Sequence, residues 1–141
     1  MGNVFASGYG SFYFYVAVNA AIMLALAVLV VRARQGTQTA IGDGGNPAMI
    51  AAVRAHGNNT EYVPMGLLLL WSVVALGGSI WLVHGVGASL TLGRLLHGFG
   101  LSRSTGVSTA RLLGVVLTWA AFVVGIVAVL WLVFVLPGAA S

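Results

Sequence analysis

The sequence predicts an all-α integral membrane protein, a four-helix bundle in which residues 1–141 form one domain. Of the 141 residues, 60% are hydrophobic and 6% are charged, whereas a soluble domain carries about 25% charged residues. The mean hydropathy of +1.03 agrees with a membrane protein. A membrane-spanning helix needs about 20 apolar residues, so the chain is long enough for four of them.

The composition excludes several classes of site. The absence of cysteine rules out disulfides, thiolate metal sites and a cysteine nucleophile. The net charge of +4 comes from arginines scattered among apolar stretches, so we expect no nucleic-acid partner. The histidines lack the carboxylate neighbours and the spacing of a metal site, and we assign none. The first residues lack the basic region of a cleaved signal sequence.

The apolar stretches predict helices over residues 12–33, 47–76, 82–101 and 108–136. The first helix follows a polar lead at 1–11 and opens with the aromatic run Phe12-Tyr13-Phe14-Tyr15, which is typical of a membrane interface. A glycine-rich loop is expected over 35–46, and Pro47 suits the first turn of the second helix. Pro64 removes a backbone hydrogen bond, so we expect a kink there.

The later connections are predicted to be short. The turn before the third helix is placed at Gly77-Gly78 or nearer to His84-Gly85. A loop over 102–107 precedes the fourth helix, which is expected to end before Pro137-Gly138.

Arginines near the helix ends predict the orientation in the membrane. Arg32 and Arg34 end the first helix and Arg103 lies in the last loop, while the other loops and both termini have no Lys or Arg. The positive-inside rule then puts these arginines in the cytoplasm and both termini outside. The polar residues expected toward this cytoplasmic side are Arg54, Glu61, Arg94, His97 and Arg111.

The most polar part of the chain is the stretch 54–64 in the second helix. Arg54, Asn58 and Glu61 stand at i, i+4 and i+7, which places them on one helical face within roughly 60°. Ionisable groups at bilayer depth cost about 2.5–3.5 kcal/mol each, so they usually line a bundle interior or a wet cavity. This face is therefore the predicted functional site.

Two motifs resemble the signature of the MAPEG superfamily, the membrane-associated proteins in eicosanoid and glutathione metabolism. They are Arg54-Ala55-His56-Gly57-Asn58 with Glu61 and Pro64, and Gly93-Arg94-Leu95-Leu96-His97. The likeness covers essentially the whole chain and is greatest to bacterial members. It implies a homotrimer of four-helix subunits, with glutathione bound between neighbouring subunits and catalysis that favours the glutathione thiolate.

The resemblance also implies roles for individual residues. Matched by position, the glutathione-binding residues are Arg32, Arg54, Asn58, Glu61 and His97, and the catalytic residue is Arg111. Arg94 is added to the binding residues because of its charge. Two positions depart from the prostaglandin synthase of this superfamily. That enzyme has a tyrosine where this chain has Leu101, and a serine where this chain has Leu112. Prostaglandin isomerisation is therefore not expected.

The charges of these residues fit glutathione on physical grounds as well. Glutathione carries two carboxylates and one ammonium, so a matching cavity needs several cations and one anion. Arg54, Arg94 and Arg111 offer planar donor groups suited to carboxylates. Glu61 suits the ammonium or a peptide N–H, and Asn58 suits the peptide amides. A cation near the sulfur lowers the pKa of the thiol and raises its nucleophilic fraction.

Structural roles are the alternative for several of these residues. Arg94 and Glu61 could neutralise one another inside the bundle, and His97 could join two helices through a hydrogen bond. Asp43 lies between two glycines, which favours a turn residue over one that folds across the site. The remaining histidines and the tryptophans are assigned to packing and to the membrane interface: His56, His84, Trp71, Trp81, Trp119 and Trp131.

We therefore expect a membrane-bound glutathione transferase or peroxidase of the bacterial inner membrane, with its site toward the cytoplasm. Its second substrate would be a hydrophobic electrophile that enters from the lipid bilayer. A non-catalytic, lipid-binding protein of the same superfamily is the first alternative, and the joint presence of Arg54, Asn58 and Glu61 argues against it. A small channel is the second, but the chain has no internal repeat and no polar outer halves to its spans.

Overall fold

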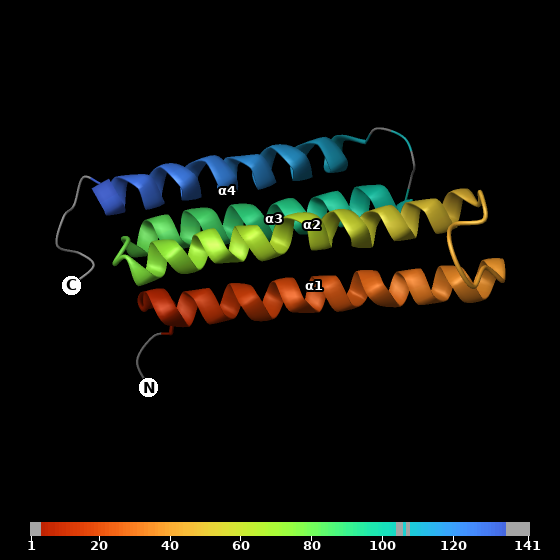
Figure 1. The fold of residues 1–141 in the computed structure, drawn as a ribbon, viewed down its shortest axis with the longest axis horizontal. Helices are drawn as coiled ribbons and strands as arrows, with labels where there is room; N and C mark the ends of the chain where they lie inside the picture. Colours follow the sequence, from red (N-terminus) through yellow and green to blue (C-terminus); the bar gives the residue numbers. More distant parts are fainter. Residues whose placement is uncertain (1–3, 104–105, 107, 135–141) are drawn as a thin grey trace.

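The computed structural model describes residues 4–103, 106 and 108–134 and confirms an all-helical bundle. Its helices are η1 (Val4–Ala6), α1 (Gly8–Thr37), α2 (Pro47–Ala75), α3 (Ile80–Arg103) and α4 (Thr109–Phe134). The four long helices alternate in direction, so the start of α1 and the end of α4 lie at one end of the bundle (Figure 1). The α1–α2 and α3–α4 connections lie at the other end, as the predicted topology requires.

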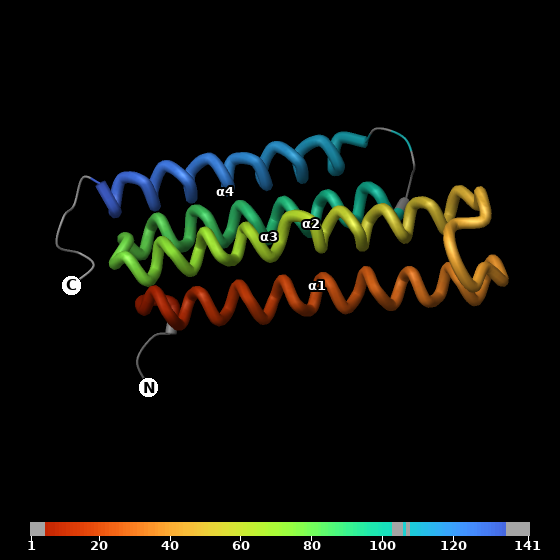
Figure 2. Tube along the Cα trace, viewed as in Figure 1, coloured from red at the N-terminus to blue at the C-terminus, as the bar shows by residue number. Residues whose placement is uncertain are grey.

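α2 and α3 form the centre of the bundle. Each packs against the other and against both α1 and α4, which lie on opposite sides of the central pair (Figure 2). The main core consists of buried apolar side chains from all four helices, among them Tyr15, Leu70, Val73, Val83, Leu90 and Ala121. A side chain on α2 or α3 can therefore meet residues from several other helices.

The first helix is longer at both ends than the sequence predicted. It begins at Gly8 because Ser7 acts as the N-cap and accepts a hydrogen bond from the Gly10 backbone N–H. It ends at Thr37, where Gln38 adopts the left-handed conformation of a helix C-cap. The predicted lead at 1–11 and loop at 35–46 were therefore too long, since the caps and not the polarity of the segments decide where the helix stops.

The second helix begins at Pro47, as predicted, with Asn46 capping it through bonds from the Ala48 and Met49 backbone N–H groups. It continues as one helix through Pro64 to Ala75. The following turn contains Gly77 at a φ of 73°, so the alternative turn at His84-Gly85 is wrong.

The last two helices follow the predicted order with shifted ends. α3 starts at Ile80 and extends to Arg103, two residues beyond the predicted 82–101 at each end. α4 starts at Thr109 and is described as far as Phe134. The predicted end of the fourth helix, before Pro137-Gly138, lies outside the described residues.

Two of the described helices, α1 and α4, are long and apolar enough by length and composition to cross a membrane. α2 and α3 have 29 and 24 residues, which is also sufficient length for a span. Their composition is less apolar than that of α1 and α4, because they carry the polar residues of the two motifs. Both lie in the centre of the bundle, where such residues can face neighbouring helices instead of lipid.

α3 and α4 approach each other closely because glycines line their contact. A Cβ atom added to Gly114 would lie 2.5 Å from the backbone nitrogen of His97, and one added to Gly100 would lie 2.8 Å from the Arg111 nitrogen. Small residues of this kind let helix backbones approach in membrane bundles. The close contact brings the second half of α3 beside the start of α4, and this places Arg111 near His97.

Candidate functional site

Arg94 lies at the point where α2, α3 and α4 meet. It is 1% exposed, and its Nε donates to Thr118 Oγ1 on α4 at 3.1 Å. Its Nη1 donates to Asn58 on α2, to Oδ1 at 2.8 Å and to the backbone carbonyl at 3.3 Å. The guanidinium carbon lies 5.2 Å from the centre of the Tyr62 ring, within the range of a cation–π interaction. Arg94 thus connects three helices.

The alternative pairing of Arg94 with Glu61 is not formed within the described part of the chain. The Arg94 bonds go to Asn58 and Thr118, while Glu61 is exposed on the surface of α2. The carboxylate of Glu61 therefore has no compensating cation from its own described helices.

His97 lies one turn after Arg94 on α3 and is buried. Arg94 and Arg111 are both close enough to interact electrostatically with its ring. No described residue forms a hydrogen bond with that ring, so the helix–helix bond considered from the sequence is not formed among these residues. Arg94 and Arg111 bring positive charge together from α3 and α4 around the His97 ring, and the three residues are here called the arginine cluster.

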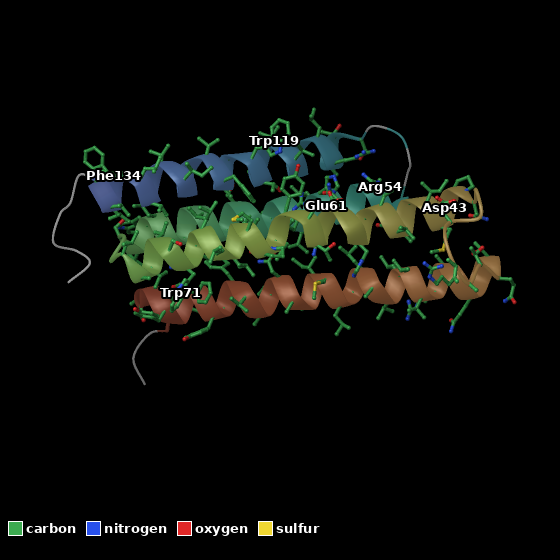
Figure 3. All side chains as sticks on the ribbon, viewed as in Figure 1. Asp43, Arg54, Glu61, Trp71, Trp119 and Phe134 are labelled. Atoms are coloured by element: carbon green, nitrogen blue, oxygen red, sulfur yellow. The ribbon has the colours of Figure 1, made fainter. Side chains whose placement is uncertain are left out.

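Arg54, Asn58 and Glu61 follow one side of α2, as their spacing predicted. Arg54 and Glu61 are exposed and Asn58 is half-buried; Figure 3 shows Arg54 nearer to the α1–α2 loop and Glu61 further along the helix. Tyr62 stacks edge-on against Phe122 of α4, so α2 and α4 run alongside each other in a fixed register. Counting eight residues back along both helices brings Arg54 to the level of Gly114, about one helical turn from Arg111.

Two of the predicted residues lie apart from this arrangement. Arg32 is exposed on the last part of α1 and makes no described contact with the arginine cluster. Asp43 lies in the α1–α2 loop, at the end of the bundle where α4 begins (Figure 3), and its Oδ1 accepts a hydrogen bond from the Gly45 backbone N–H at 2.9 Å. The preferred assignment of Asp43 as a turn residue is therefore confirmed.

Comparison with known proteins identifies the family of the chain. The model of the MAPEG family matches residues 12–131. The chain belongs to the MAPEG family. It is 33% identical over 117 residues to the inner membrane protein YecN of Escherichia coli strain K12 and to the same protein of strain CFT073, covering 83% of this chain and 88% of each relative. No solved structure gives a significant match. As a MAPEG member, the chain is an integral membrane protein.

Two residues that contact Arg94 were missed from the sequence. The position of Tyr62, next to Glu61 and one turn after Asn58, could have indicated a place in the site. Its contact with Arg94 could not be predicted, because Arg94 lies on another helix, α3. Thr118 could have been recognised from the sequence, because no other Ser, Thr, Asn, Gln or charged residue occurs between Leu112 and Phe134. A single hydroxyl in so apolar a helix, 1% exposed in the structure, indicates a polar partner on another helix.

A second polar group occupies the opposite end of the bundle. His84 Nδ1 and the Tyr15 hydroxyl are 2.9 Å apart, and His84 Nε2 lies 3.1 Å from the Phe5 carbonyl. Ser11, fully buried, donates to the same carbonyl at 3.2 Å and lies 3.4 Å from His84 Nε2. These three side chains, Ser11, Tyr15 and His84, form the histidine cluster. The sequence assigned Tyr15 and His84 to the membrane interface, and the structure adds that each has a specific partner inside the bundle.

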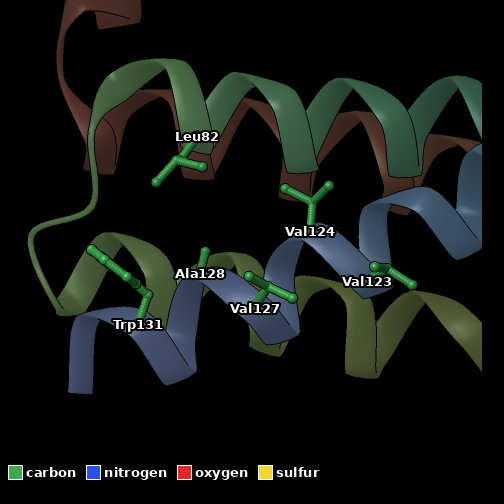
Figure 4. Close-up of a pocket in the computed structure, with 6 residues that line it drawn as sticks. All are labelled: Leu82, Val123, Val124, Val127, Ala128 and Trp131. Atoms are coloured by element: carbon green, nitrogen blue, oxygen red, sulfur yellow. The ribbon is translucent and has the colours of Figure 1, made fainter. Parts of the chain in front are cut away.

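Two apolar grooves lie on the outer surfaces of α3. The first, between α3 and α4, has a volume of about 380 Å³ and is lined by Leu82, Val123, Val124, Val127, Ala128 and Trp131 (Figure 4). The second, of about 400 Å³, lies between α1 and α3 and contains mostly alkyl side chains such as Ile22, Leu26 and Leu95. Both suit hydrocarbon, whether from lipid or from an apolar substrate.

Proposed function

We propose that this protein is a glutathione-dependent transferase or peroxidase of the bacterial inner membrane. The single observation that supports this function best is the convergence of Arg94, His97 and Arg111 beside Asn58, with Arg54 and Glu61 on the adjoining surface of α2. Several cations and one carboxylate match the two carboxylates and one ammonium of glutathione. The inner-membrane location rests on the relative YecN, whose name places that protein there.

The same residues support a homotrimer. Arg54 and Glu61 are exposed on one copy of the chain, although α2 lies among helices that belong in the membrane. An ionisable group that faces hydrocarbon costs about 2.5–3.5 kcal/mol, so this side of α2 requires a cover. A second copy of the chain provides one, and a closed ring of three copies lets every subunit cover its neighbour. Glutathione would then bind between subunits.

The chemistry follows from positive charge beside a thiol. Arg111 is exposed enough to face a ligand, and the two arginines Arg94 and Arg111 both lie close to His97, so a thiol bound here would ionise more readily beside their positive charge. In the transferase reaction the sulfur forms a bond to an electrophilic carbon and the leaving group departs. In the peroxidase reaction two glutathiones reduce one hydroperoxide to an alcohol and water and form glutathione disulfide.

One binding measurement and two activity assays test this proposal. The purified protein in detergent or in vesicles is titrated with glutathione in a calorimeter, and conjugation of a chloronitrobenzene and reduction of a lipid hydroperoxide are followed. We expect saturable glutathione binding and at least one of the two activities above that of vesicles without protein. Absence of binding would overturn the proposal.

A second candidate is a non-catalytic lipid-binding function, which the two apolar grooves favour. It predicts that lipid-like molecules bind with neither conjugation nor peroxide reduction. Glutathione binding without turnover would therefore favour this candidate over the transferase.

A further inference from the structure

We propose that Arg94 and Thr118 fix the side-chain amide of Asn58 in one orientation, so that the site presents a hydrogen-bond donor, and not an acceptor, to its ligand at this position. The inference rests on the proposed function, since it names the group of the ligand that Asn58 recognises.

The orientation follows from the chemistry of the contact between Arg94 and Asn58. A guanidinium has five N–H donors and no acceptor, so it can bond only the oxygen of an amide. Arg94 Nη1 contacts Asn58 Oδ1 at 2.8 Å and the Asn58 backbone carbonyl at 3.3 Å. Rotating the amide by half a turn would place its NH₂ group against the guanidinium, donor against donor, and leave Arg94 Nη1 only the longer bond to the backbone carbonyl.

Arg94 itself is held in place by Thr118. The Thr118 hydroxyl donates its proton to the Gly114 carbonyl at 2.7 Å, so its oxygen has only lone pairs to offer to Arg94 Nε at 3.1 Å. Tyr62 lies against the guanidinium at 5.2 Å. With both Arg94 and Thr118 at 1% exposure, the guanidinium has little room to move. Thr118 is therefore a positioning residue that acts through Arg94 on Asn58.

Because the Asn58 oxygen faces Arg94, the NH₂ group of the same amide is directed away from Arg94. The Nδ2 of Asn58 bonds no described residue, and Asn58 is half-buried on the side of α2 that carries Arg54 and Glu61. An amide NH₂ group requires an acceptor, which glutathione supplies as a peptide carbonyl or a carboxylate oxygen. The expectation that Asn58 bonds peptide amides in general is thereby narrowed to their carbonyl oxygens, and the ammonium is left to Glu61.

Asn58 is tested first by two substitutions. Asn58→Asp keeps the oxygen that faces Arg94 and removes the donor, whereas Asn58→Ala removes both. We expect the unfolding temperature of Asn58→Asp to match or exceed that of the unsubstituted protein and that of Asn58→Ala to fall, because only the former retains a partner for Arg94. Glutathione affinity should fall about tenfold in both variants, the size of one hydrogen bond to a charged group.

Thr118 provides a second pair of variants. Thr118→Val preserves the shape of the side chain and removes the hydroxyl, while Thr118→Ser preserves the hydroxyl and removes a methyl group. A positioning role predicts weaker glutathione binding in Thr118→Val and near-normal binding in Thr118→Ser, and a packing role predicts the reverse order.

The readouts separate the inference from the proposed function. If the unsubstituted protein binds no glutathione, the proposed function fails, and the unfolding temperatures of the Asn58 variants still decide the orientation of the amide. If glutathione binds and Asn58→Asp either unfolds like Asn58→Ala or keeps full affinity, the inference is overturned.

Discussion

The histidine cluster and the arginine cluster are both polar groups inside an apolar bundle, but they differ in how far their hydrogen-bonding capacity is used. In the histidine cluster, the ring nitrogens of His84 and the hydroxyls of Tyr15 and Ser11 all have partners within the described chain. In the arginine cluster, the ring of His97 has none there. A satisfied polar group stabilises the fold, whereas unused donors and charges are available to a ligand.

Two adjacent asparagines of α2 also differ in how far their hydrogen-bonding capacity is used. Asn58 is half-buried and bonds Arg94 through Oδ1. Asn59 is 2% exposed, and neither of its side-chain polar atoms has a hydrogen-bond partner among the residues that the structure describes. The first belongs to the candidate site, and the second is a cost to stability that no described contact offsets.

The largest expected effect comes from Gly114→Val, which should damage the arginine cluster and the fold together. The added side chain would collide with the backbone of α3 at His97, so we expect a loss of about 3 kcal/mol in unfolding free energy, with loss of glutathione binding. Thermal unfolding in detergent and calorimetry measure the two effects. Gly36→Val is the matched control, since nothing lies within 4 Å of a Cβ at Gly36. Equal stability of the two variants would contradict the role of the close α3–α4 contact.

Glu61→Gln should separate binding from stability. Glu61 is exposed and has no ion pair among the described residues, so its neutralisation should leave the unfolding temperature unchanged. Glutathione affinity should fall about 10- to 100-fold, as expected for loss of a hydrogen bond between charged groups. Arg54→Ala should behave in the same way, and the proposed trimer should persist in both variants on size-exclusion chromatography. Unchanged affinity in calorimetry would place glutathione elsewhere.

His84→Phe should lower stability without changing glutathione affinity, the reverse of the effect expected for Glu61→Gln. It leaves the buried hydroxyl of Tyr15 without its partner, so we expect a loss of about 1–2 kcal/mol in unfolding free energy and unchanged glutathione affinity. A double-mutant cycle with Tyr15→Phe should give a total smaller than the sum of the two single effects, because both remove the same bond. An effect on glutathione affinity would show that the histidine cluster is coupled to the site.

Asn59→Leu has the smallest expected effect, and unlike the preceding substitutions it should stabilise the protein. Replacing a buried amide without partners by an apolar side chain of similar size should raise the unfolding free energy by about 1 kcal/mol. Asn58→Leu, one residue earlier, should lower it, since Arg94 then loses its acceptor. A fall in stability for Asn59→Leu would indicate a polar partner for Asn59, such as a bound water.

The sequence by itself determined what depends on composition and on neighbours along the chain. Low charge and high hydropathy determined the membrane class, and Asn46 with Pro47 determined where α2 begins. Helical periodicity placed Arg54, Asn58 and Glu61 on one face, because this spacing is a local property of any helix. The two motifs gave the family.

Only the tertiary structure decided what each polar face meets. The partners of Arg94 come from helices α2 and α4, and the bond between Tyr15 and His84 joins positions 69 residues apart. Such contacts depend on how closely the helices approach, which glycines on α3 and α4 set through the packing of their backbones. Periodicity along one helix contains no information on the distance between helices. It therefore identified the polar residues, but not which of them have hydrogen-bond partners on other helices.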